Sequence, residues 1–131
     1  MSAVRLGSGG AWEGIVGYSR VVTIGDQAWV SGCTAATVAG TVAHPGDAGG
    51  QTRVALATVA QALTDAGFAL GDVVRTRIYV TDISRWEEVG RAHGEVFGEI
   101  RPATTMVQVA ALIDPSMLVE IEADAVRGAS A

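Results

Sequence analysis

The chain has 131 residues, 49% hydrophobic and 18% charged, and its fourteen acidic and nine basic side chains give a formal charge of -5. This length predicts a single domain over residues 1–131, large enough to bury its own core without disulfides or a structural metal. Every basic residue is an arginine. That excludes chemistry built on a lysine nucleophile or Schiff base, including pyridoxal-phosphate attachment.

Metal, nucleic-acid and membrane functions are also disfavoured. Cys33, His44 and His93 show neither CxxC nor HExxH spacing, so we expect no metal and no other cofactor. The arginines are dispersed and the net charge is negative, which argues against a nucleic-acid partner. The uncharged stretch 27–46 is too polar to span a membrane, and the first ten residues do not resemble a signal peptide. We therefore expect a cytoplasmic protein with no membrane association.

The first half of the chain predicts a hairpin, a loop and a helix. Strands at Tyr18–Thr23 and Gln27–Ser31 flank Gly25-Asp26, a dipeptide favoured in hairpin turns. Residues Gly40–Gly50 form a loop by composition. Apolar residues recur at helical spacing over Gln51–Ala66, where the following Gly67 is typical of a helix end.

The second half predicts a strand, a helix and two further strands. Val73–Val80 alternates as a strand, and Ser84-Arg-Trp-Glu87 reads as a capping box that starts a helix reaching Phe97. Thr104–Val109 and Leu118–Val126 are strand-like, with a turn around Asp114-Pro115-Ser116. The alternation places Val74, Thr76, Ile78 and Val80 on one face of the first strand, and the helical spacing places Trp86, Val89, His93, Val96 and Phe97 on the inner stripe of the helix.

This order of elements predicts two helices on one face of a mixed sheet, in two layers. The other face is then open to water or covered by another subunit. On the last strand Glu120, Glu122 and Asp124 share a face. We expect Arg75 and Arg77 to pair with them, although a carboxylate beside a cleft could instead act as a general base.

Three further side chains have both a structural and a chemical interpretation. His93 lies among apolar residues, where a hydrogen-bonded histidine at the edge of the core is more common than an acid or base. His44 lies in a polar loop and is expected to be solvated. Cys33 has no histidine near it in the sequence, so a buried thiol is favoured over a nucleophile.

Several segments together resemble the Rid family of reactive-intermediate deaminases, also called the YjgF/YER057c/UK114 family. The matching stretches are Gly17-Tyr18-Ser19, Val30-Ser31-Gly32, Asp72 to Asp82, Arg101-Pro102-Ala103-Thr104-Thr105 and Val119 to Val126. The resemblance implies an α+β, two-layer, chorismate-mutase-like fold with a mixed six-stranded sheet and two helices on one face. It also implies a homotrimeric barrel with small-molecule clefts between subunits, and cofactor-free hydrolysis of imines and enamines.

The family's functional residues carry over by motif. Glu120 matches the glutamate that helps to hold the attacking water, Tyr18 matches a tyrosine of the pocket, and Ser31-Gly32 matches the segment beside it. Thr104 departs from the archetypal pattern, which has an arginine there to bind the substrate carboxylate. A threonine cannot make this bidentate contact. The resemblance is therefore to a divergent subgroup whose substrate differs from the archetypal 2-imino acids.

Three other side chains are candidates to replace that arginine. Arg101 is a poor substitute, because strand alternation directs it away from the face of Thr104. Arg20 lies two residues after Tyr18 and can approach the cleft, although an ordinary surface ion pair is an equal interpretation. His93 lies where family pockets can receive a side chain, and a neutral imidazole would suit an uncharged substrate.

Three functions are compatible with this family resemblance to different degrees. The leading hypothesis is a deaminase-like hydrolase of a small imine, enamine or related metabolite, with Glu120 positioning water and Thr104 making a neutral contact. The alternative is a trimer that binds a metabolite without catalysis, which the missing arginine favours and the retained Glu120 disfavours. An endoribonuclease is disfavoured by the acidic charge and by two histidines on unrelated elements.

Overall fold

Six strands form one mixed sheet in the computed structural model, which describes residues 2–129. The strands are β1 (Val4–Leu6), β2 (Val21–Ile24), β3 (Gln27–Cys33), β4 (Val73–Val80), β5 (Ala103–Gln108) and β6 (Val119–Val126), in the order β1-β2-β3-β6-β4-β5. β4 and β5 run parallel, and the other neighbouring pairs are antiparallel. The α-helices are α1 (Glu13–Val16), α2 (Ala48–Asp65) and α3 (Trp86–Phe97), with 3-10 turns η1 (Leu70–Asp72) and η2 (Ile83–Arg85).

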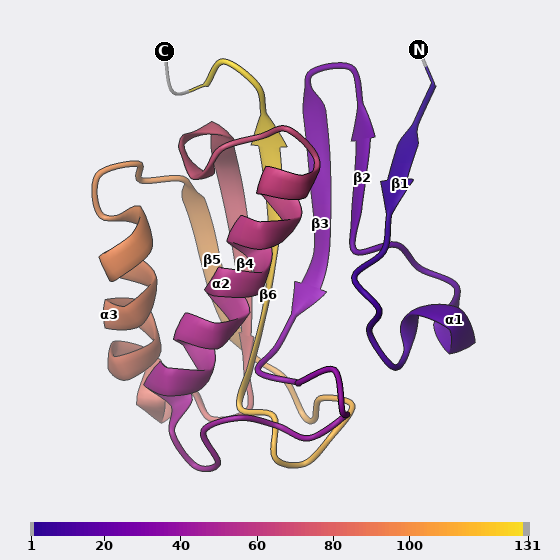
Figure 1. Cartoon of the computed structure of the whole chain (residues 1–131). Helices are drawn as coiled ribbons and strands as arrows, with labels where there is room; N and C mark the ends of the chain where they lie inside the picture. Colours follow the sequence, from indigo (N-terminus) through magenta and orange to yellow (C-terminus); the bar gives the residue numbers. More distant parts are fainter. Residues whose placement is uncertain (1, 130–131) are drawn as a thin grey trace.

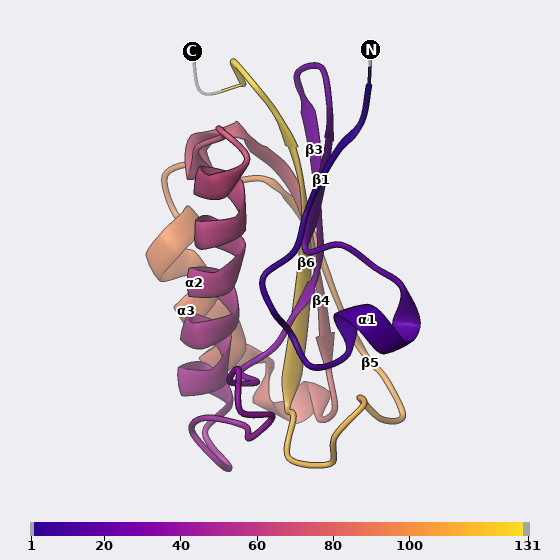
Figure 2. The ribbon, with the colours of Figure 1, turned by 45° about the vertical axis from the view of Figure 1, so that its right-hand side comes forward.

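The two long helices cover one face of the sheet and leave the other face open. Figure 2 shows α2 and α3 together on one side, and Figure 1 shows α1 beyond the β1–β2 end of the sheet. The two-layer α+β arrangement predicted from the sequence is confirmed. Trp29 and Val107 lie on strands of the sheet and are each about two-fifths exposed in the single chain (40% and 43%).

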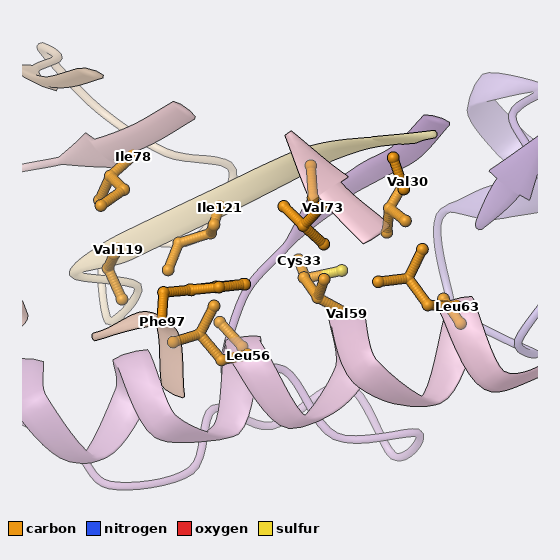
Figure 3. Packing of buried hydrophobic residues seen from close by; sticks show 14 of the residues in the cluster. Val30, Cys33, Leu56, Val59, Leu63, Val73, Ile78, Phe97, Val119 and Ile121 are labelled. Carbon is orange, nitrogen blue, oxygen red and sulfur yellow. The ribbon is translucent and has the colours of Figure 1, made fainter. Parts of the chain in front are cut away.

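The core lies between α2, α3 and the sheet (Figure 3). Leu56, Val59 and Leu63 of α2 are almost completely buried, and they pack with Ile121 of β6 and Phe97 of α3. Burying a side chain of this kind contributes roughly 1.5–3 kcal/mol relative to exposure. The apolar stripe read from residues 51–66 is therefore the face that joins the two layers.

Helix α2 begins earlier than the sequence predicted. Asp47 precedes the helix in extended conformation, and its carboxylate accepts a hydrogen bond from Gly50 N at 2.9 Å. This N-cap lets Ala48-Gly49-Gly50, assigned by composition to the loop, form the first turn instead. At the other end Gly67 has the left-handed conformation expected of it (φ +82°).

Because of a β-bulge, the first residues of β4 face the opposite way from the prediction. The pairing with β6 shifts between Val73 and Arg75, so strict alternation fails there. Val73 is consequently buried and Val74 is 40% exposed, the reverse of the prediction for Val74. Beyond the bulge, Thr76, Ile78 and Val80 are buried as predicted.

The start of α3 also differs from the prediction. Asp82, rather than Ser84, supplies the capping oxygen, accepting from Ser84 N at 3.0 Å at the start of η2. The expected capping box at Ser84–Glu87 is therefore absent, since Ser84 lies within the 3-10 turn. Trp86 is the first residue of α3 and is 56% exposed, outside the inner stripe. Val89, His93 and Phe97 are buried as predicted.

The acidic face of β6 is partly neutralised by its neighbour β4. Arg77 Nη1 lies 3.6 Å from Glu122 Oε1 and 3.3 Å from Asp124 Oδ2, and Tyr79 donates a hydrogen bond to Glu122 at 2.7 Å. The pairing predicted for Arg77 is confirmed. Arg75 forms no ion pair with any acid of residues 2–129, so its predicted role was wrong.

Gln51 joins three segments beneath the sheet. Its side chain is fully buried on α2 (0% exposed). Nε2 donates to the carbonyl oxygens of His44 and Ser116 at 3.2 and 2.9 Å, and Oε1 accepts from Leu118 N at 2.8 Å. One amide thus fixes the loop before α2 and the start of β6, two residues before Glu120.

We predict that Gln51→Leu lowers the free energy of unfolding by about 1–3 kcal/mol, because the partly buried Leu118 N–H and two carbonyls lose their partner. Urea unfolding followed by circular dichroism, at one protein concentration, measures this change. The matched control is Gln61→Leu on the same helix, which removes only an exposed hydrogen bond to Asp65. The control should change stability by less than about 0.5 kcal/mol, and equal losses in the two variants would contradict the assignment.

Candidate functional site

A cleft of about 790 Å³ opens where β2 and β3 meet the N-terminal segment. Its lining comes from residues within 8–18, Arg20, the β3 residues Ser31–Cys33, the loop that follows them, one side of α2, and residues within 113–120. Most of these side chains are apolar or small. Arg20, the residue before β2, and Glu120 of β6 are charged groups on the two sides of β3, and Asp65 adds an acid from α2.

A bulge in β3 shapes the floor of this cleft. The register with β6 shifts between Val30 and Cys33, which leaves Ser31 and Gly32 without regular partners. A side chain at Gly32 would collide with the carboxylate of Glu120, whose Cδ lies 2.7 Å from the position of such a Cβ. The glycine therefore makes room for the Glu120 carboxylate.

Glu120 differs from the two other acids of its strand because its carboxylate is uncommitted. Glu122 binds Tyr79 and Arg77, and Asp124 binds Arg77. Among residues 2–129, no side chain or amide donates a hydrogen bond to Glu120. Burial raises the pKa of Glu120, the nearby Glu122 raises it further, and the Arg20 guanidinium opposes both effects. A carboxyl group of this kind can exchange protons closer to neutral pH than an ordinary glutamate.

Arg20 is a buried cation, 8% exposed, and not a surface ion pair. Its Nη1 donates to the carbonyl oxygens of Ser31 and Gly32 at 3.1 and 2.8 Å, which holds the bulge. Nη2 donates to Tyr18 Oη at 3.3 Å, and the guanidinium lies over the Tyr18 ring. The structure thus brings Arg20 into the cleft, one of the two interpretations that the sequence left open.

Five of the seven predicted site residues meet here. Tyr18, Arg20, Ser31, Gly32 and Glu120 all line the cleft. The Ser31 hydroxyl is already engaged, since it donates to the carbonyl oxygen of Ser19 at 2.6 Å. Its role in the folded chain is to fix the strand before the bulge.

Cys33 also lines the cleft but is not poised as a nucleophile. Its side chain is 1% exposed, and burial raises the pKa of the thiol to about 11 despite the opposing Arg20 charge. A thiol with this pKa is almost entirely protonated at neutral pH. The preference for a buried thiol over a nucleophile is therefore supported by its surroundings.

Thr104 and His93 lie away from this cleft in the single chain. Thr104 is on β5, which is separated from β6 by β4. The hydroxyl of the buried Thr76 lies 2.8 Å from Thr104 Oγ1 and 2.9 Å from His93 Nε2, so the three side chains form one hydrogen-bonded chain. His93 is therefore the hydrogen-bonded core histidine that the sequence favoured.

Sequence reasoning missed the apolar walls of the cleft. Trp12 and Val16 come from the N-terminal segment, Val54 and Thr58 from α2, and Ile113 from the loop before β6. No motif marks them, because tertiary contacts alone bring these segments together. Within residues 2–129, no group of His, Cys, Asp and Glu side chains could hold a metal ion, and no helix is long and apolar enough to cross a membrane.

Known proteins share this fold and much of this sequence. A family model described as "Endoribonuclease L-PSP" matches residues 10–127. The crystal structure of a YjgF/YER057c/UK114 family member from Mycobacterium tuberculosis is 53% identical, with a TM-score of 0.87, and the match covers 95% of this chain and 99% of that one. The chain belongs to the Rid family. The mixed six-stranded sheet with helices on one face is the fold of that family.

Two further relatives have sequences similar to this chain, and one of them is named for an activity. An uncharacterized protein of Streptomyces coelicolor is 39% identical over 126 residues, covering 95% of this chain and 92% of its own length. The 3-aminoacrylate deaminase RutC of Acinetobacter baylyi is 40% identical over 80 residues, covering 61% of this chain and 63% of its own. The Rid family therefore includes a named deaminase similar to much of this chain.

We predict that His93 makes stability fall as the medium is acidified. Burial lowers the pKa of His93 below its ordinary value of 6.5 in the folded state. As the pH falls below 6.5, His93 binds a proton more readily in the unfolded chain than in the folded one, so the free energy of unfolding decreases. His93→Gln keeps a hydrogen-bonding group but cannot titrate, so it should lose less stability between about pH 7 and pH 5.

Urea unfolding across this pH range tests the prediction. His44→Gln is the control for removal of a histidine, because the His44 side chain is 53% exposed whereas His93 is buried. A His93→Gln variant with the slope of the wild type would show that His93 is protonated equally well in both states.

Proposed function

We propose that the protein hydrolyses a small imine, enamine or related reactive metabolite, without a cofactor. The observation that carries the proposal is the uncommitted Glu120 carboxylate, which lies in the cleft against Gly32 with a raised pKa. Membership of the Rid family and the similarity to a named deaminase support this reaction class.

The reaction needs few groups. Water adds to the carbon of the C=N bond, the nitrogen gains protons, and the resulting carbinolamine loses ammonia as the C=O bond forms. Glu120 is suited to accept a proton from the attacking water and to return it to the departing nitrogen. The buried Arg20 charge favours negative charge that develops nearby.

We also propose that the working form is a homotrimer with the cleft at a subunit boundary, as the resemblance to the Rid family implies. Exposed apolar side chains of the sheet, Trp29 and Val107 among them, support a covered open face. Within one chain Thr104 lies two strands from Glu120. A neighbouring subunit would therefore be needed to bring Thr104, with His93 behind it, to the cleft as a neutral substrate contact.

The resemblance to the Rid family also implies substrate contacts by Tyr18, Ser31 and Gly32, beside Arg20; because the Ser31 hydroxyl is engaged by Ser19, Ser31 contributes through its backbone. Ribonuclease chemistry is disfavoured, because the two histidines cannot act as a pair. His44 is exposed in the loop before α2, whereas His93 is buried beneath β4. The metabolite-binding alternative differs from the hydrolase only in whether Glu120 supports turnover.

We expect Glu120→Gln to reduce kcat/KM by about 10²-fold or more, because the amide cannot relay a proton. The control is Glu122→Gln, on the same strand face, whose side chain can still accept the hydrogen bond of Tyr79. Ammonia release from imines other than 2-imino acids, generated in situ by an amine oxidase, provides the assay. If the wild type binds metabolites and Glu120→Gln changes no detectable turnover, the binding function replaces the catalytic one.

A second prediction concerns position 104. The wild type should hydrolyse 2-iminopropionate and 2-iminobutyrate poorly, and Thr104→Arg should raise kcat/KM by about tenfold or more through a charged hydrogen bond to the carboxylate. Thr104→Met is the control, since it lengthens the side chain without adding charge. Efficient hydrolysis of both imines by the wild type, with no gain in Thr104→Arg, would contradict the substrate argument.

A further inference from the structure

Arg20 is a buried guanidinium without a carboxylate partner. No acidic side chain in residues 2–129 has an oxygen within 4.0 Å of its nitrogens. Among these residues, Arg20 is linked to an acid only indirectly, through Ser8. The Ser8 hydroxyl accepts a hydrogen bond from Arg20 Nε at 3.4 Å and donates one to Glu13 at 2.7 Å. A buried charge normally requires a partner of opposite sign, because its desolvation is costly.

One N–H group of Arg20, which lines the cleft, is left without an acceptor among residues 2–129. The Nη1 group is occupied by the carbonyls of Ser31 and Gly32. The Nη2 group carries two N–H bonds and has one acceptor among residues 2–129, Tyr18 Oη at 3.3 Å. Because Tyr18 Oη accepts that bond, its own O–H remains available to donate. Both side chains line the cleft.

We propose that Arg20 and Tyr18 form the anion subsite of the cleft, binding a carboxylate of the ligand through Nη2–H and Oη–H. The two donor atoms lie 3.3 Å apart, a spacing at which each can take one oxygen of the same carboxylate. The apolar wall formed by Val54, Val16 and Ile113 suits an aliphatic or aromatic remainder. The ligand class is therefore a small carboxylate with an apolar body.

This inference refines the substrate of the proposed hydrolysis and rests on the same cleft. A carboxylate bound by Tyr18 and Arg20, just before β2, lies at a different place in the site from one bound at position 104 on β5. The preferred imine then carries its carboxylate at a different separation from the C=N bond than a 2-imino acid does. A different position of the carboxylate explains how the cleft can have an anion subsite and still be expected to act poorly on 2-imino acids.

Binding without turnover tests the subsite. Nuclear magnetic resonance titrations compare 3-phenylpropionate with 3-phenylpropionamide, and butyrate with butyramide, since each pair differs in charge but little in shape. The wild type should bind each acid at least about tenfold more tightly than its amide. Equal affinity for acid and amide in the wild type overturns the proposal, whatever the variants do.

Three variants show which residues cause the preference for the acid over its amide. The ratio of the two affinities should fall below about twofold in Arg20→Gln and be reduced in Tyr18→Phe. It should be unchanged in Arg91→Gln, which replaces an exposed arginine of α3. Full preference in a folded Arg20→Gln or an unchanged Tyr18→Phe overturns the subsite. An acid preference without imine hydrolysis would reject the proposed function alone, and hydrolysis without the preference would reject the subsite alone.

Discussion

The bond between the Arg20 guanidinium and the carbonyl oxygens of Ser31 and Gly32 is the interaction on which the cleft depends. A bulge leaves strand carbonyls without ladder partners, and a buried peptide group must find another one. Arg20 supplies that partner and introduces a positive charge at the same time. The bulge in turn places Gly32 against the Glu120 carboxylate, so one irregularity in β3 positions both Arg20 and Glu120.

Burial and partner choice separate three acids that look alike. Glu120, Glu122 and Asp124 share one face of β6, yet Arg77 and Tyr79 engage only the last two. The remaining carboxylate is partly desolvated, which disfavours its charged form and raises its pKa. A structural ion-pair network and a carboxyl group without such partners thus occupy the same strand.

The site depends on supports that lie outside it. Gln51 fixes the start of β6 from within the core, and Thr76 ties His93 to Thr104 across the β4–β5 pair. These hydrogen bonds satisfy the buried side chains of Gln51, Thr76 and His93 and help to hold the strands in one register. The strand order places Thr104 two strands from Glu120, which is why the proposed function calls on a second subunit.

The sequence by itself determined the layers, most of the elements and the candidate acid. Periodicity is local, so the apolar stripe of α2 and the alternation of β6 could be read from neighbouring residues. Tertiary structure decided the rest: the bulges that exposed Val74 and freed Ser31 and Gly32, the Asp82 cap, and the short β1 and α1. It also left Glu120 without the partners that Glu122 and Asp124 have, and it buried Arg20, because partners and desolvation depend on segments far apart in the chain.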